Sequence, residues 1–125
     1  MSRTFAAIAA LTFILASSAA SAQVLKTADT PKGKTFVDAK GMTLYTFDKD
    51  AGGKSACNGP CAANWPPLMA DASAKAEGAW TIVTRDDGSK QWAYHGKPLY
   101  TFLKDEKAGD RTGDSFKNVW HVAKP

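Results

Sequence analysis

The chain has 125 residues, including 16 basic, 12 acidic and two cysteine side chains. The 103 residues that follow residue 22 are enough for one small domain. They carry 15 basic and 12 acidic side chains, a net charge of +3, with lysines scattered among aspartates. This pattern argues against a nucleic-acid-binding surface and predicts a solvated one, with weak attraction to anionic envelope surfaces as an alternative.

Residues 1–22 have the layout of a secretory signal peptide. Arg3 supplies a positive charge, residues 5–16 form an uncharged run, and Ala20-Ser21-Ala22 offers a small-residue cleavage site. The alternative is a transmembrane anchor, which needs about 20 apolar residues, whereas this run has twelve. We therefore expect cleavage after Ala22, a periplasmic or secreted mature chain, and no transmembrane anchor. No cysteine directly follows the cleavage site to accept a lipid.

Short strands separated by turn residues are predicted along the rest of the chain. The segment 23–34 is polar, contains Pro31 and Gly33, and is predicted to be a lead-in without regular structure. The alanine-rich stretch 70–79 is the candidate for a helical turn. Apolar and β-branched runs bounded by turn residues predict six strands, at 35–37, 42–47, 80–84, 91–94, 99–102 and 119–122.

A decapeptide occurs twice, as GMTLYTFDKD at 41–50 and GKPLYTFLKD at 96–105. Seven of the ten positions are identical at a constant offset of 55 residues, and Trp65 and Trp120 share that offset. Neither half could bury a core alone, so we expect two related units that cover each other's apolar faces. The predicted fold is mainly β, a small single domain of two homologous β units with short strands and long polar loops, spanning 35–125 with units at about 35–70 and 80–125.

Strand geometry places the Tyr and Phe of each LYTF segment on one face, and the Leu and Thr on the other. Aromatic side chains bury large areas. We therefore expect the core to contain Tyr45, Phe47, Tyr100 and Phe102. The alternative is an exposed aromatic strip that binds a ligand.

Cys57 and Cys61 are separated by Asn-Gly-Pro, which favours a tight turn. Outside the cytoplasm such a pair tends to persist as a disulfide, which would contribute about 2 kcal/mol by closing a short loop. The C-x-x-x-C spacing, followed by Ala62, excludes the C-x-x-C-H haem-attachment motif and differs from the C-x-x-C of redox pairs. Reactive thiols, or a metal site shared with His95 and His121, are the alternatives.

An aspartate closes each decapeptide, Asp50 in the first and Asp105 in the second. Directly after a strand, Asp commonly forms an Asx-turn or caps the next turn. The alternative is a weak cation site, because oxygen ligands cluster here, although no Glu closes either loop as in an EF-hand. The candidate ligands are Asp48, Asp50, Asp105, Asp110 and Asp114.

The pattern Y-x-[FWY]-x-x-D occurs at Tyr45, Phe47 and Asp50 and again at Tyr100, Phe102 and Asp105. Residues 57–68 add C-x-G-x-C-A and W-P-P-L. With these motifs, most of the chain after residue 33 resembles a bacterial family of secreted repeats described as predicted lipoproteins. The resemblance implies an exported envelope domain of undetermined function and supplies no catalytic residues. This sequence differs from many relatives in lacking a lipid-acceptor cysteine.

No Gly-x-Ser-x-Gly, His-Glu-x-x-His or phosphate-binding glycine motif is present, so an enzyme is not favoured and no catalytic residue is assigned. We expect a monomeric, exported cell-envelope module with a binding or structural role, whose partner is an envelope component or a small ligand and not nucleic acid. Binding predicts a concave surface lined by carboxylates or tryptophans, whereas a structural role predicts burial of Trp65, Trp80, Trp92 and Trp120. The alternative function is a periplasmic metal-ion or haem carrier using His95, His121, Met42 or Met69; no cofactor is otherwise predicted.

Overall fold

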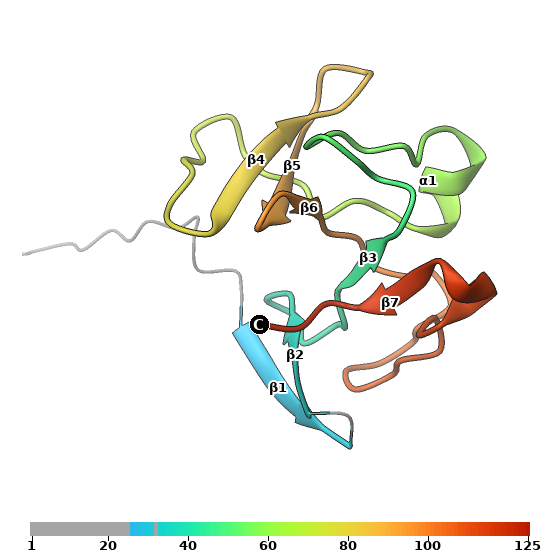
Figure 1. The fold of residues 1–125 in the computed structure, drawn as a ribbon. Helices are drawn as coiled ribbons and strands as arrows, with labels where there is room; N and C mark the ends of the chain where they lie inside the picture. The colour runs from blue at the N-terminus through green and yellow to red at the C-terminus, as the bar shows by residue number, and fades with distance from the viewer. Residues whose placement is uncertain (1–25, 32) are drawn as a thin grey trace, which may run out of the picture.

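Short antiparallel strands dominate the computed structural model, which describes residues 26–31 and 33–125 (Figure 1). The predicted signal peptide lies outside the described residues. The elements in chain order are β1 (Lys26–Thr30), β2 (Gly33–Val37), β3 (Tyr45–Phe47), α1 (Pro60–Asn64), β4 (Trp80–Thr84), β5 (Lys90–Tyr94), β6 (Lys97–Pro98), the 3-10 helix η2 (Phe116–Asn118) and β7 (Trp120–Val122). The predicted fold class, a mainly β single domain of two repeated units, is confirmed.

The strands form three small sheets, β1–β2, β3–β7 and β4–β5–β6, and all pairs are antiparallel. In Figure 1 the β1–β2 hairpin and the β4–β5–β6 sheet lie at opposite ends, with β3 and β7 between them. The two hairpins correspond with a one-residue difference, because Thr27 faces Phe36 in one and Ile82 faces Trp92 in the other, so β1 and β4 keep the offset of 55 whereas β2 and β5 are offset by 56. The repeated sequence therefore folds into a repeated supersecondary unit.

The two units are interlocked through their LYTF segments. The backbone N–H of Tyr45 donates to Tyr100 O at 2.8 Å, and the N–H of Tyr100 donates to Tyr45 O at 3.0 Å. Tyr45 also pairs with Val122 of the second unit, and Tyr100 pairs with Pro67 of the first. Since 45 and 100 share the offset of 67 and 122, this exchange is a local twofold arrangement centred between the two tyrosines.

Both faces of the LYTF segments are covered. One buried cluster contains Tyr45 and Tyr100, and a second contains Leu44 and Leu99; all four side chains have no exposed surface. The leucine face is therefore as deeply buried as the tyrosine face. It is buried because these segments lie between the two clusters rather than at the edge of one. Of the two predicted core phenylalanines, Phe102 is buried and Phe47 is half-buried.

Several local predictions need correction. The segment 23–34 was predicted to be irregular, but it contains strand β1. The sequence of β1, KTADT, is polar and mostly exposed, so alternation gives no signal, and the strand exists because it pairs with β2. The stretch 70–79 forms turns and no helix. The second LYTF segment, 99–102, is not a continuous strand, because single bridges at Tyr100 replace a ladder.

The helix that does form, α1, has only five residues, too few for a periodic signal. Gly59 precedes it with φ 59°, a left-handed conformation that glycine adopts without strain. Pro60 begins it, where its fixed φ favours the first turn. The segment ends where Trp65 N–H donates to Cys61 O at 2.8 Å.

Candidate functional site

The motif aspartates bind the motif tyrosines of the opposite unit. Tyr45 Oη donates to Asp105 Oδ2 at 2.7 Å, and Tyr100 Oη donates to Asp50 Oδ2 at 2.6 Å. Each aspartate uses its other oxygen for its own loop. Asp50 Oδ1 accepts from Ala56 N at 2.7 Å, and Asp105 Oδ1 accepts from the N–H and hydroxyl of Thr112 at 2.9 and 2.6 Å. The repeated hexapeptide thus ties each loop to the other unit.

These contacts are made in the interior. Burial, followed by the hydrogen bond to the opposite aspartate, raises the pKa of both Tyr45 and Tyr100 well above that of a free phenol. Burial also raises the pKa of Asp50, against the lowering effect of its hydrogen bonds from Ala56 and Tyr100. The phenols therefore stay protonated as donors and are unsuited to act as bases.

A buried arginine extends one of the two pairs into a network. Arg85 is 6% exposed and donates to Ser55 Oγ at 3.1 Å, Gln91 Oε1 at 2.8 Å and Cys57 O at 2.7 Å. Ser55 Oγ lies 2.6 Å from Tyr100 Oη, which links the guanidinium to Asp50 through two hydroxyls. These groups satisfy one another, so the network supports the fold.

Four stacked rings cross the interface between the units. Phe47 stacks on Trp120 at 4.1 Å between ring centroids, Trp120 on Trp65 at 3.7 Å, and Trp65 on Phe102 at 4.0 Å. The offset of 55 maps this column onto itself. Trp65, Trp92 and Trp120 are buried and Trp80 is half-buried, close to the arrangement expected for a structural role.

The predicted disulfide between Cys57 and Cys61 is confirmed, with Cα atoms 5.2 Å apart. Cys57 is fully buried, and its carbonyl accepts the hydrogen bond from Arg85 Nη2. The disulfide therefore fixes the position of a carbonyl group that belongs to the hydrogen-bond network of Arg85 and Ser55. Neither sulfur is free to bind a metal with the histidines.

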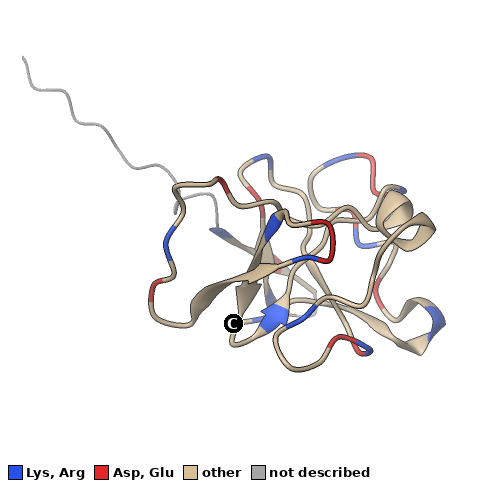
Figure 2. Cartoon of the chain, turned by 90° about the horizontal axis from the view of Figure 1, so that it is seen from above, with Lys and Arg blue, Asp and Glu red and all other residues tan. Residues whose placement is uncertain are grey.

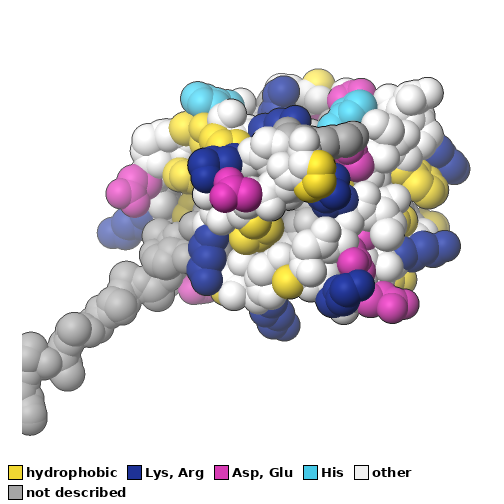
Figure 3. All heavy atoms as spheres, turned by 90° about the horizontal axis from the view of Figure 1, so that it is seen from below, with side chains coloured by type: hydrophobic (Ala, Val, Ile, Leu, Met, Phe, Trp, Pro, Cys, Tyr) yellow, Lys and Arg dark blue, Asp and Glu magenta, His cyan; other side chains and the backbone are white. Residues whose placement is uncertain are grey.

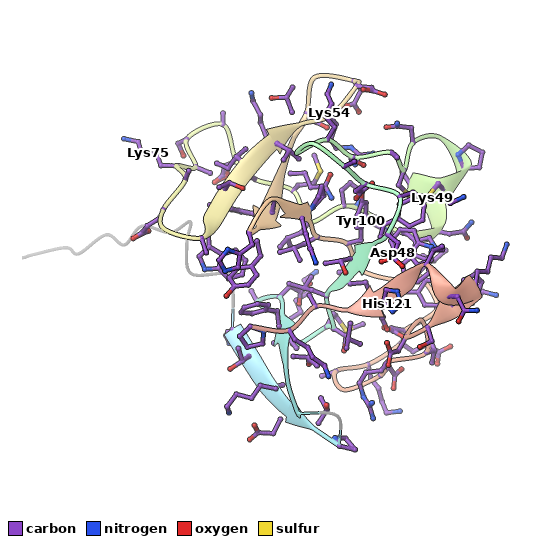
Figure 4. The ribbon with its side chains drawn as sticks, in the orientation of Figure 1. Asp48, Lys49, Lys54, Lys75, Tyr100 and His121 are labelled. Carbon is purple, nitrogen blue, oxygen red and sulfur yellow. A yellow bond between two sulfur atoms is a disulfide. The ribbon has the colours of Figure 1, made fainter. Side chains whose placement is uncertain are left out.

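A surface hollow of about 560 Å³ contains both histidines, and we call it the histidine hollow. His121 Nε2 lies 2.9 Å from Asp48 Oδ2, and Figure 4 shows the two side chains close together beside β7. Figure 3 shows the two histidine side chains apart on one face, with lysine side chains between them. The lining residues are Thr46, Asp48, Tyr94, His95, Lys97, Leu99, His121, Val122, Ala123, Lys124 and Pro125.

The candidate metal ligands do not assemble into one site. Asp50 and Asp105 are engaged by tyrosines, and hydrogen bonds from Glu106 N and Lys107 N hold the pKa of Asp110 below its usual value. Met69 is exposed. Within residues 26–31 and 33–125, no group of three or more His, Cys, Asp or Glu side chains could hold a metal ion. Of the candidates, His95, His121 and Asp48 line the histidine hollow together.

Sequence reasoning missed Arg85, Ser55 and Gly113. Arg85 had no local signal, because its partners lie 6 to 30 residues away in the sequence. Gly113 lies against the ring column, where an added Cβ would meet Trp65 at 2.5 Å. The lysines of the histidine hollow also went unnoticed, since exposed lysines occur throughout the chain, and Figure 2 shows basic and acidic segments interspersed along the loops.

Comparison with known families gives one match. A family model described as a secreted repeat of unknown function matches twice, at residues 26–69 and 81–124. The first match begins at β1, so the repeat includes this strand, which lies in the segment 23–34 that was expected to be a lead-in. No curated protein and no solved structure matches the chain. Among the described residues, no helix has the length and apolar character needed to cross a bilayer.

Proposed function

The chain belongs to this family of secreted repeats, and from that premise we propose that it is an exported binding module of the cell envelope. The motif residues Tyr45, Tyr100, Asp50 and Asp105 have a structural role, because their side chains hydrogen-bond to one another. A ligand must therefore bind to other side chains. The histidine hollow is the surface that supports this proposal.

The composition of the histidine hollow is the observation that carries the proposal. Its volume of about 560 Å³ lies within the range of small-molecule pockets. Lys97, Lys124, His95 and His121 line it, whereas Asp48 is the single acidic side chain among the described lining residues and is already bonded to His121. Nitrogen donors around a partly apolar floor suit a small organic anion, such as a dicarboxylate or a phosphate ester.

Both units contribute to this hollow. Thr46 and Asp48 come from the first unit, and the other lining residues come from the second. Their relative position depends on the β3–β7 pairing, in which Thr46 faces His121. The interlocked core thus positions a recognition surface that neither repeat contains alone.

The proposal can be tested by nuclear magnetic resonance titration with succinate and with inorganic phosphate as probes. We expect saturating shift changes at backbone amides of His95, Lys97 and His121 for at least one probe. Lys97→Gln should weaken that binding several-fold, whereas Lys75→Gln, which changes an exposed lysine outside the hollow, should not. If the shift changes do not saturate with either probe, or if Lys97→Gln does not weaken the binding, a structural role is the better description.

We further propose that the protein works in the periplasm or outside the cell as a monomer, after removal of residues 1–22. The support is the signal-peptide layout of the N-terminus. Denaturing and native mass spectrometry of protein made through its export pathway tests this. A chain that begins at Gln23 and lacks two thiol hydrogens is expected. A retained N-terminus or a stable dimer would contradict the respective part.

A further inference from the structure

Two exposed apolar side chains, Leu103 and Phe116, are found beside Phe102. Among the residues that the structure describes, three large hydrophobic side chains are exposed: Met69 at 51%, Leu103 at 60% and Phe116 at 38%. Phe116 packs against Phe102, with ring centroids 5.6 Å apart, and Leu103 directly follows Phe102 in the chain. Single exposed hydrophobic residues are ordinary on a protein surface, but two at one place call for a reason.

A groove of about 360 Å³ lies beside these two residues, between the short helices α1 and η2. Figure 1 shows both helices at the same edge of the fold. The rings of Trp65 and Trp120, only 4% and 3% exposed, form its floor. Leu103 lies on its rim, because its N–H donates to Asn64 O at 2.9 Å.

Lysines surround the groove. Lys104 and Lys117 line it, and none of the described residues that line it is acidic. Lys49 occupies in the first unit the position of Lys104 in the second, and Figure 4 shows it beside α1. We call Leu103, Phe116, Lys49, Lys104 and Lys117 the docking edge. Its chemistry is two apolar tips surrounded by three positive charges.

The backbone pays a conformational cost to present Phe116 and Lys117. Ser115, Lys117 and Asn118 have φ of 65°, 51° and 59°, which non-glycine residues seldom adopt. Hydrogen bonds hold the turn, from Ser115 N to Trp120 O at 2.7 Å and from Asn118 N to Ser115 O at 2.9 Å. The result is an exposed aromatic ring with the Lys117 ammonium 5.6 Å from its centroid. The inner side of the Phe116 ring packs against Trp65 and Phe102, with centroids 5.8 and 5.6 Å away, and 38% of the residue is exposed to solvent.

We propose that the docking edge binds the surface of a bilayer that contains anionic phospholipids. Phe116 and Leu103 enter the boundary between headgroups and acyl chains, and the three lysines lie against the lipid phosphates. A secreted protein meets such surfaces during and after export. The contact is shallow and reversible, because two apolar side chains and a few charges give only weak partitioning. It does not depend on the histidine hollow.

The test is co-sedimentation of the exported protein with vesicles, either pure phosphatidylcholine or phosphatidylcholine with phosphatidylglycerol. We expect binding only to the anionic vesicles and its loss at high salt. Replacing Lys49, Lys104 and Lys117 together with Gln should lower the partition coefficient about 100-fold, at about fivefold for each charge. The double variant Leu103→Ser and Phe116→Ser should lower it about tenfold.

Two matched controls separate docking from general stickiness. Met69→Ser removes the third exposed hydrophobic side chain, and Lys75→Gln removes a charge that Figure 4 shows on the opposite side from α1. Both should bind as the parent does. The controls and the lysine variant should keep the parental melting temperature because their changed side chains are exposed. The Leu103→Ser and Phe116→Ser variant loses a ring that packs against Trp65 and Phe102, so its binding is measured well below its own melting temperature. Equal binding to neutral vesicles, no binding at all, or an equal loss in the controls would overturn the proposal.

Discussion

Replacing Tyr45 with Phe removes one oxygen atom from the interior and should lower the free energy of unfolding by about 2–3 kcal/mol. Tyr45 is fully buried and Asp105 is 6% exposed. The hydroxyl is the hydrogen-bond donor to Asp105 Oδ2 and also accepts from Gly113 N at 3.2 Å. Loss of the hydroxyl leaves the Asp105 carboxylate and the Gly113 N–H buried without this hydrogen-bond partner. A hydrogen bond to a charged group contributes about 1.5–3 kcal/mol.

The exchange between units makes a sharper prediction for pairs of substitutions. In a double-mutant cycle, Tyr45→Phe and Asp105→Asn should show a coupling energy of about 1–2 kcal/mol, because they share one hydrogen bond. Tyr45→Phe and Asp50→Asn lie in the same hexapeptide but share no hydrogen bond. Their effects should add within about 0.5 kcal/mol. The mirror cycles with Tyr100 should show the same contrast.

Urea unfolding followed by tryptophan fluorescence measures these energies. Tyr94→Phe is the matched control, because this half-buried tyrosine lies in strand β5 outside both hexapeptides, and its stability should match the parent within about 0.5 kcal/mol. Coupling within a hexapeptide as large as the coupling across units would refute the exchange. So would Tyr45→Phe and Tyr100→Phe variants that are both as stable as the parent.

Three further outcomes are expected. Because burial keeps Tyr45 and Tyr100 protonated while the unfolded phenols ionise near pH 10, stability should be complete below that pH and fall above it by about 2.7 kcal/mol per pH unit for the pair, as alkaline urea titrations would show. Cys57→Ser should cost about 2 kcal/mol, seen as a melting temperature about 10 °C lower in oxidised protein, and reducing agent should then have no further effect on the variant. Gly113→Ala should cost at least about 1–3 kcal/mol, since its Cβ would lie 2.5 Å from a Trp65 ring atom; a variant of parental stability would show that the ring column yields.

Local signals were sufficient for several features of this protein. The repeated decapeptide showed two units, and β-branched runs between turn residues showed a mainly β domain. The Asn-Gly-Pro turn between Cys57 and Cys61 indicated the disulfide, because closing so short a loop depends on local geometry. Strand β4 was predicted with its observed bounds, since Trp80–Thr84 is a compact apolar and β-branched run.

Weak local patterns failed where pairing with distant residues decides the structure. Strand β1 is polar and exists through its ladder with β2, and Tyr100 pairs by single bridges with Tyr45 and Pro67. The histidine hollow and the docking edge each combine residues far apart in the chain. A sequence pattern describes neighbours along the backbone, so it carries little information on such surfaces.

The sequence by itself determined that the Y-x-[FWY]-x-x-D hexapeptide is used twice, but only the tertiary structure decided how. Period-two geometry is local and turns each tyrosine towards the interior. Which aspartate it meets depends on the antiparallel crossing of the two units at Tyr45 and Tyr100. Because of that crossing, Tyr45 hydrogen-bonds to Asp105 and Tyr100 hydrogen-bonds to Asp50. Residues five apart in the chain thus bind partners 50 and 60 positions away, because the units are stable only when each completes the other.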